Sequence, residues 1–131
     1  MSAAPLDTRR KIVAPEAISR SQPIILVSGF FDPLLASHAN RLEALRRDGR
    51  RLAVLLSDPP DPVLPLRVRA QLVAALRAVD YVLLADGAAT DHNSESEIIR
   101  RVQPEEIVRE EKADQRRTRE LIAYIRARQS A

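Results

Sequence analysis

The sequence predicts an α/β domain with a parallel sheet of about four strands, helices on both faces of the sheet and an extra C-terminal helix. Short apolar runs alternate with longer segments in which apolar residues recur at helical spacing, in the order β-α-β-α-β-α-β-α. Such alternation is typical of parallel strands joined by right-handed helical crossovers. Apolar residues make up 45% of the chain but aromatic residues only 3%, so we expect an aliphatic core.

The length of 131 residues fits one domain with an ordinary core. We expect residues 1–10, which are polar and include Pro5, to form a flexible arm, and residues 11–131 to form a single domain. Because the chain has no cysteine, disulfides and thiolate zinc sites are excluded. Since it has only two histidines, we predict no metal-binding residues.

The charge pattern is mixed, with 21 basic and 18 acidic residues and a net charge of +3. Nucleic-acid binders usually gather basic residues on one face, whereas acidic residues are interleaved here, as in Arg109-Glu110-Glu111-Lys112. No apolar segment approaches the ~20 residues that span a bilayer, and the first residues lack the apolar core of a signal peptide. We therefore predict a cytoplasmic protein that binds neither nucleic acid nor membranes.

The first strand is predicted over residues 24–27, an apolar run bounded by Pro23 and Gly29. A continuous run of this kind suits a strand that is buried on both faces. A helix should follow over residues 35–45, with one apolar face. That face comprises Leu35, Ala39, Leu42 and Leu45. The helix should stop at Asp48-Gly49, where Gly49 suits a C-terminal cap.

The second strand is predicted over residues 52–56, and a stiff loop with four prolines follows it. Pro65 can begin the next helix, which we expect to close at Asp80. Its apolar positions at helical spacing are Val68, Leu72, Ala75, Leu76 and Val79. Residues 81–84 then form the third strand.

The last part of the chain begins with a polar loop over residues 86–93. Ser94 and Glu97 have the spacing of a capping box ahead of a helix that Pro104 ends. Residues 107–108 form a short fourth strand, and residues 112–128 a charged helix. A narrow apolar stripe, Leu121, Ile122 and Ile125, should dock this helix on the surface.

The stretch PIILVSGFFDPLLASH, residues 23–38, is the candidate functional site. A strand, a tight turn and a helix N-terminus direct backbone N–H groups and the helix dipole at one point, which favours an anion. In open parallel sheets, ligands also bind beyond the carboxyl ends of the strands. As alternatives, Gly29 could simply allow a positive φ, and Asp32-Pro33 could be an ordinary turn.

The spacing G-F-F-D-x-x-L-x-S-H resembles G-x-F-D-x-x-H-x-G-H, the signature of the cytidylyltransferase-like nucleotidyltransferases. Leu35 stands in place of the first histidine and Ser37 in place of the second glycine. The matching positions are Gly29, Phe31, Asp32 and His38. The resemblance covers roughly residues 11–108 and is closest in form to the heptose-phosphate adenylyltransferases, which implies a Rossmann-like sheet.

The resemblance also implies roles for individual residues. His38 would be catalytic, stabilising the transferring phosphate. The nucleotide- or phosphate-binding residues would be Gly29, Phe30, Phe31, Asp32, Ser37, Asp58 and Arg69. The family reaction transfers a nucleoside monophosphate from ATP or CTP to a phosphorylated sugar or alcohol, usually with Mg²⁺, and releases pyrophosphate. The family often forms homodimers. Without a site role, Arg69 would be a solvated helix arginine, and we expect no function for His92.

Four departures from the family pattern predict impaired catalysis. Leu35 cannot donate to a phosphate, and the loop at residues 59–62 lacks the family lysine. Arg109-Glu110-Glu111 replaces K-G-x-D, and nothing after Lys112 resembles the fifth strand or the S-T-T motif. Two hypotheses remain: a nucleotidyltransferase-like protein that binds a nucleotide or phosphosugar, and a non-catalytic interaction or assembly module without a small-molecule ligand. In either case Glu105, Glu106 and the terminal helix could protect the short fourth strand as a sheet edge.

Overall fold

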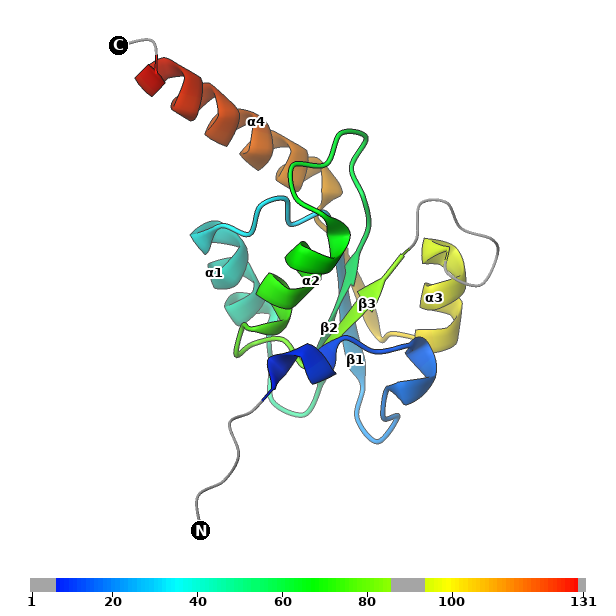
Figure 1. Ribbon diagram of the computed structural model, residues 1–131. Coiled ribbons are helices and arrows are strands. Elements are labelled where there is room, and N and C mark those ends of the chain that lie inside the picture. Colours follow the sequence, from blue (N-terminus) through cyan, green and yellow to red (C-terminus); the bar gives the residue numbers. More distant parts are fainter. Residues whose placement is uncertain (1–6, 86–93, 130–131) are drawn as a thin grey trace.

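A computed structural model describes residues 7–85 and 94–129 and contains one parallel sheet (Figure 1). The strands are β1 Ile24–Gly29, β2 Arg51–Leu56, β3 Tyr81–Leu84 and β4 Glu106–Arg109. Their order in the sheet is β3-β2-β1-β4, and every neighbouring pair is parallel. The predicted fold class is therefore confirmed, with β1 longer than expected because it continues through Ser28 and Gly29.

Helices cover both faces of the sheet (Figure 1). α1 (Ala36–Leu45) and α2 (Leu66–Ala74) lie on one face, and α3 (Glu95–Val102) lies on the other. Alternate residues of β1 feed two separate aliphatic cores: Ile25 and Val27 pack towards α1 and α2, whereas Ile24 and Leu26 pack towards α3. This is the two-sided burial that a continuous apolar strand indicates.

The N-terminal segment joins the fold before the first strand. Two 3-10 helices, Thr8–Lys11 and Pro15–Ala17, precede β1. Lys11 Nζ donates to the carbonyl of Leu76 at 3.0 Å, and Ile12 pairs with Val82 at the edge of β3. Of the expected arm, residues 1–6 lie outside the described residues, as does the polar loop 86–93 with His92.

Helix α2 buries a different face from the one that its apolar spacing predicts. Val68 and Leu72 are each 41% exposed, and the helix ends at Ala74 rather than near Asp80. The buried positions are Arg69, Ala70, Val73 and Ala74. Arg69 lies outside the predicted apolar face, yet it is fully buried and donates to backbone carbonyls. The buried face is therefore rotated about the helix axis by about 100° or more, since each residue turns the helix by about 100°. Val79 is buried as expected, although it lies beyond the helix.

The helix termini follow local signals in part. Ser94 Oγ accepts a hydrogen bond from the Glu97 N–H at 3.2 Å, which confirms the Ser94 half of the predicted capping box of α3. Helix α1 ends at Leu45, however, with Arg46 as its C-cap. Gly49 has a φ of 82° and lies in the turn that leads to β2, so it does not cap the helix as predicted.

Helix α4 (Glu111–Gln129) leaves the body of the molecule after its first turns (Figure 1). Among the described residues, its buried side chain is Asp114, whereas Ile122, Tyr124 and Ile125 are 36%, 60% and 45% exposed. The prediction that its apolar stripe docks on the surface is therefore wrong. The contacts that hold α4 are polar and lie at its N-terminal end. No helix among residues 7–85 and 94–129 is long and apolar enough to cross a membrane.

Candidate anion-binding site

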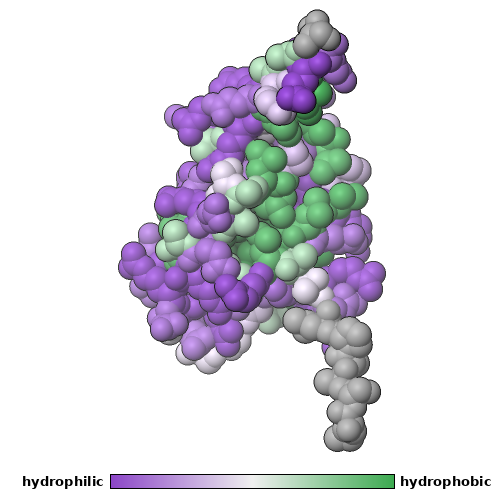
Figure 2. All heavy atoms as spheres, turned by 90° about the vertical axis from the view of Figure 1, so that its left-hand side faces the viewer, coloured by the Kyte–Doolittle hydropathy of each residue, from purple (hydrophilic) through white to green (hydrophobic). Residues whose placement is uncertain are grey.

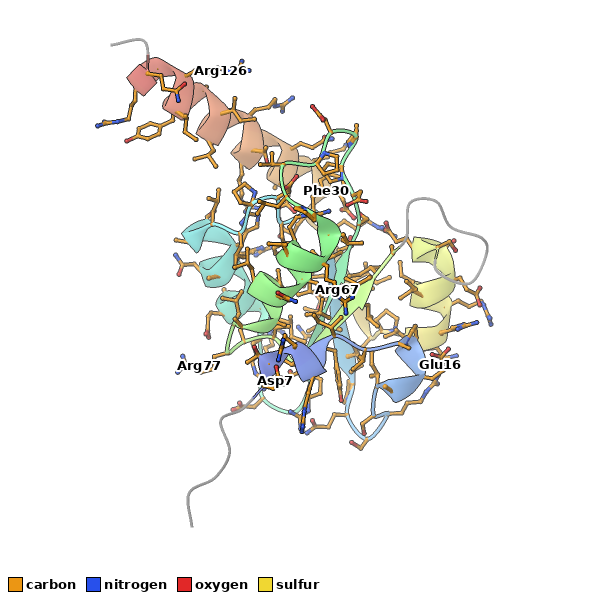
Figure 3. All side chains as sticks on the ribbon, viewed as in Figure 1. Asp7, Glu16, Phe30, Arg67, Arg77 and Arg126 are labelled. Carbon is orange, nitrogen blue, oxygen red and sulfur yellow. The ribbon has the colours of Figure 1, made fainter. Side chains whose placement is uncertain are left out.

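The turn between β1 and α1 lies at the carboxyl end of the sheet, next to the first turns of α4. Figure 3 shows Phe30 there, at the base of the projecting helix. Phe31 has a φ of 47°, an uncommon conformation for a residue with a large side chain. This sharp bend turns the backbone N–H groups of Phe30 and Phe31 towards the same side.

These two N–H groups bind a carboxylate of the same chain. Phe30 N–H and Phe31 N–H donate to Asp114 Oδ2 at 2.8 and 3.1 Å, and His38 Nε2 lies 2.7 Å from Asp114 Oδ1. The side chains of His38 and Asp114 are 2% and 1% exposed. The donors expected to face a phosphate therefore converge on one anion, and that anion is Asp114.

The geometry fixes the tautomer of His38. The Leu35 N–H donates to Nδ1 at 2.9 Å, so this nitrogen carries no proton, and Nε2 donates to Asp114. The imidazole thereby satisfies an N–H group at the start of α1, as the side chain in a capping box does. The Phe31 ring packs against the imidazole, with 4.8 Å between ring centroids. Both ring nitrogens of His38 are engaged.

The environment of Asp114 favours its ionised form. Burial raises the pKa of Asp114, but hydrogen bonds from His38, Phe31 and Phe30 outweigh that effect and hold the pKa below its ordinary value. Arg117 Nη1 adds an ion pair at 2.8 Å to Oδ1. The contacts around the turn therefore favour a carboxylate, rather than a carboxylic acid, at Asp114.

Gly29 makes this contact possible because it has no side chain. A Cβ at this position would lie 2.5 Å from Asp114 Oδ2 and 2.8 Å from the Phe31 ring. Both distances are far shorter than van der Waals contact. The alternative role of Gly29, a positive φ, is wrong, since the positive φ falls on Phe31 instead.

Asp32 is also buried, but it serves the neighbouring loop. Its carboxylate accepts hydrogen bonds from the N–H groups of Val63 and Leu64 at 2.7 and 2.9 Å. Its backbone carbonyl accepts from Thr118 Oγ1 at 2.7 Å. Asp32 therefore joins the turn to both the proline-rich loop and α4.

Arg69 is fully buried, in contrast to the solvated arginine that is the alternative to a site role. Nη1 donates to the carbonyls of Phe30 and Ser57 at 2.8 and 2.9 Å, Nε donates to Leu64 O at 3.0 Å, and Nη2 pairs with Asp58. Its N–H groups donate to the backbone carbonyls that follow β1 and β2 and to other acceptors of the same chain. Ser37, the remaining predicted residue, is exposed on the first turn of α1.

Sequence reasoning missed the contribution of α4. Asp114, Arg117 and Thr118 have i, i+3, i+4 spacing, so they share one face of the helix. The same spacing continues to Leu121 and Ile125, which means that the docked face and the apolar stripe form one line along the helix. The spacing of these residues along one face of α4 was therefore visible in the sequence. The burial of Asp114 was not, because nothing in the sequence distinguishes it from the other charged residues of this helix.

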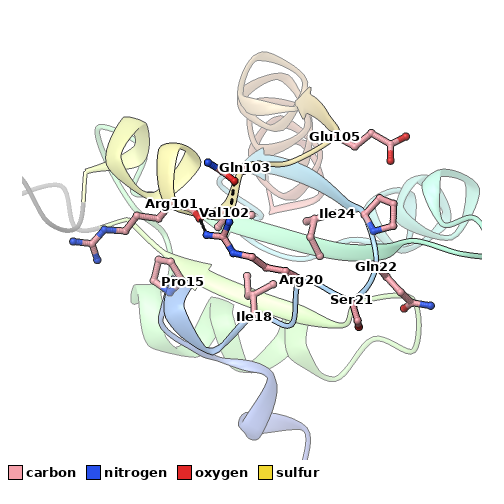
Figure 4. Close-up of a pocket in the computed structure, with 11 residues that line it drawn as sticks. Pro15, Ile18, Arg20, Ser21, Gln22, Ile24, Arg101, Val102, Gln103 and Glu105 are labelled. Atoms are coloured by element: carbon pink, nitrogen blue, oxygen red, sulfur yellow. Dashed lines mark hydrogen bonds between the residues drawn. The ribbon is translucent and has the colours of Figure 1, made fainter.

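Two hollows in the protein surface lie at opposite ends of the sheet. A hollow of about 260 Å³ lies beside the turn, and its lining includes Phe30, Pro60 and Thr118. Another, of about 370 Å³, lies at the amino ends of β1 and β4 (Figure 4). Arg20 spans it and donates to Gln103 Oε1 and to the Arg101 carbonyl at 2.8 and 2.7 Å. The first hollow adjoins the anion site, and the second does not.

Comparison with known proteins gives a consistent set of relatives. No family model matches the chain. Proteins named "Bifunctional protein HldE" match it at 29% identity over 107 residues in Alcanivorax borkumensis and at 32% over 95 residues in Gluconobacter oxydans. These alignments cover 75% and 66% of this chain but 21% and 19% of the relatives, so the chain spans about a fifth of their length. A third relative, from Edwardsiella ictaluri, is 37% identical over 56% of this chain and 17% of its own length.

Beside these matches stand the parallel sheet, in the order β3-β2-β1-β4, and the G-F-F-D-x-x-L-x-S-H spacing of the turn between β1 and α1. Together these observations relate the chain to the cytidylyltransferase-like nucleotidyltransferases.

Proposed function

We propose that the protein binds the phosphate of a nucleotide or phosphosugar at the turn between β1 and α1, and that it transfers nucleotides poorly or not at all. One observation carries this proposal: Phe30 N–H, Phe31 N–H and His38 Nε2 all point at one anion, Asp114. A phosphate oxygen and a carboxylate oxygen are both anionic acceptors, so both can accept hydrogen bonds from such donors. The site is therefore built to hold negative charge.

The related reaction transfers a nucleoside monophosphate from ATP or CTP to a phosphorylated sugar or alcohol. Catalysis there depends on stabilising charge on the phosphates and on holding them in line. In this chain His38 and the two amides could do so, whereas Leu35 offers only a backbone donor that His38 already uses. Loss of one positioned donor typically costs about 10²–10³ in rate. The Arg69 donors are engaged as well, which supports impaired transfer.

Mg²⁺ would enter this site with the nucleotide. Among the described residues there is no group of three or more histidine, cysteine or acidic side chains that could hold a metal ion. The nucleotide phosphates would therefore supply most of the ligands, as is common for Mg²⁺. A cytoplasmic location is part of the proposal, since free nucleoside triphosphates and sugar phosphates are cytoplasmic metabolites.

A second candidate function is a non-catalytic assembly module, for which a homodimer is the simplest form. The exposure of Ile122, Tyr124 and Ile125 on the projecting helix favours it. Figure 2 shows apolar surface gathered on the face seen from the α1 side, below the end of this helix. Ile107 on the edge strand β4 is also 39% exposed. Apolar surface of this kind often marks contacts with other proteins.

Calorimetric titration tests the ligand-binding function. ATP, CTP and a panel of sugar phosphates are titrated with Mg²⁺ into the wild-type chain, His38→Ala and Asn40→Ala. Asn40 is exposed on the same helix and serves as the matched control. We expect saturable binding to the wild type, at least tenfold weaker binding to His38→Ala, and no change in Asn40→Ala.

A pyrophosphate-release assay under the same conditions tests the catalytic part. We expect release close to background. His38-dependent turnover would refute the impairment, and the absence of binding by every ligand would favour the assembly module.

A further inference from the structure

The anion site is closed by a segment that is distant in sequence. Asp114 reaches the turn from α4, 83 residues beyond Phe31. Resting on the proposed function, we infer that α4 is an intramolecular competitor: Asp114 occupies the position that the ligand's phosphate needs, so the ligand binds only when the first turns of α4 leave the site.

Mutual exclusion follows from the contacts. Asp114 Oδ2 already accepts hydrogen bonds from both turn amides, and Oδ1 already accepts one from His38 Nε2–H. Each of these N–H groups can donate one well-aligned hydrogen bond. A Cβ at Gly29 would lie only 2.5 Å from Asp114 Oδ2, so the carboxylate is seated directly against the backbone of the turn. A phosphate can use these donors only after Asp114 withdraws.

The attachment of α4 is local, which makes withdrawal feasible. Besides Asp114, a hydrogen bond from Thr118 Oγ1 to the Asp32 carbonyl at 2.7 Å holds the helix. Beyond this point the helix projects from the body (Figure 1) and its apolar side chains are exposed. Few buried apolar contacts therefore oppose release, and such weakly packed segments open most readily.

The charges also favour an exchange of anions. Arg117 pairs with Asp114 on the same helix at 2.8 Å, so the carboxylate leaves together with its own cation. Glu110, which precedes α4, stays attached to the sheet, because its N–H donates to Ser28 O at 2.8 Å. The hinge about which α4 would move therefore lies directly after β4. The closed helix would lower the apparent affinity for phosphate by the fraction of molecules that are open.

The test compares Asp114→Asn with Glu120→Gln. Both substitutions remove one negative charge from α4, but Glu120 is exposed and the structure places it outside the turn contacts. Titrations use inorganic phosphate and ATP as probes. We expect Asp114→Asn to bind both at least tenfold more tightly than the wild type, and Glu120→Gln to bind like the wild type.

Hydrogen exchange of the wild-type chain gives an independent measurement that needs no variant. Saturation with ATP should slow exchange at the amides of Phe30 and Phe31 while it speeds exchange over residues 111–118. Equal affinity of the wild type and Asp114→Asn for phosphate and ATP would refute the proposal that α4 competes with the ligand. Slower exchange in the turn with unchanged exchange in α4 would refute it as well. Either result would leave the proposed binding function intact. If neither protein binds phosphate or ATP, both proposals fail.

Discussion

At Gly29, the absence of a side chain lets a carboxylate reach two backbone amides. The residue types in the turn are those of an anion site, yet the site's occupant comes from the chain itself. His38 shows the same combination of local and distant roles, because it satisfies the start of its own helix through Nδ1 and binds Asp114 through Nε2. Single residues here link two elements that are far apart in sequence.

Substitution Gly29→Ala should lower the free energy of unfolding by about 1–3 kcal/mol, because the added Cβ would overlap Asp114 Oδ2 and the Phe31 ring. Urea denaturation followed by circular dichroism measures this change. The loss should be smaller in an Asp114→Ala background, where one of the two overlapping groups is absent. Fully additive effects in this double-mutant cycle would show that Gly29 does not act through Asp114.

At the scale of elements, α2 shows how a buried arginine changes the face that a helix presents. Arg69 satisfies carbonyls at the ends of β1 and β2, and an unsatisfied buried carbonyl costs about 1–3 kcal/mol. The free energy gained by satisfying these carbonyls outweighs the cost of leaving Val68 and Leu72 exposed on the opposite side of the helix. The helix is therefore positioned by polar groups as much as by its apolar residues.

A matched pair of substitutions checks the orientation of α2. Val73→Ala, at a fully buried position, should lower the free energy of unfolding by about 1.5–3 kcal/mol through lost burial and a cavity. Val68→Ala, the same change at an exposed position, should alter it by less than about 0.5 kcal/mol. Chemical denaturation of both variants measures the two losses of unfolding free energy. A larger loss for Val68→Ala than for Val73→Ala would show that α2 buries the face that the apolar spacing predicted.

At the scale of the whole molecule, the sheet and its two cores form a closed unit from which α4 extends. β4 is an edge strand with acidic residues at its start, Glu105 and Glu106, as is common where a sheet edge must avoid unwanted pairing. The expected protection of this edge by the terminal helix is reduced, because the first turns of α4 contact the turn after β1 and the rest of the helix projects away (Figure 1). The exposed apolar residues of α4 are thus the surface on which a proposed homodimer would depend.

Substitution Ile125→Glu should weaken self-association without changing the stability of the monomer, since Ile125 is 45% exposed in the single chain. Sedimentation equilibrium over a range of concentrations measures the association. Gln129→Glu adds the same charge at a polar, exposed position of the helix and should have no effect. A wild-type chain that stays monomeric throughout would remove the homodimer from the proposed function.

The sequence by itself determined the architecture of this protein and the location of the tight turn between β1 and α1. Apolar runs and helical spacing report which local segments can be buried, and Gly29, Phe31 and His38 mark a tight turn before a helix. Only the tertiary structure decided that Asp114 occupies the turn, that Arg69 is buried, and that the apolar stripe of α4 is exposed. The physical reason is that a polar group is buried only where distant parts of the chain supply its partners, and local periodicity carries no information about them.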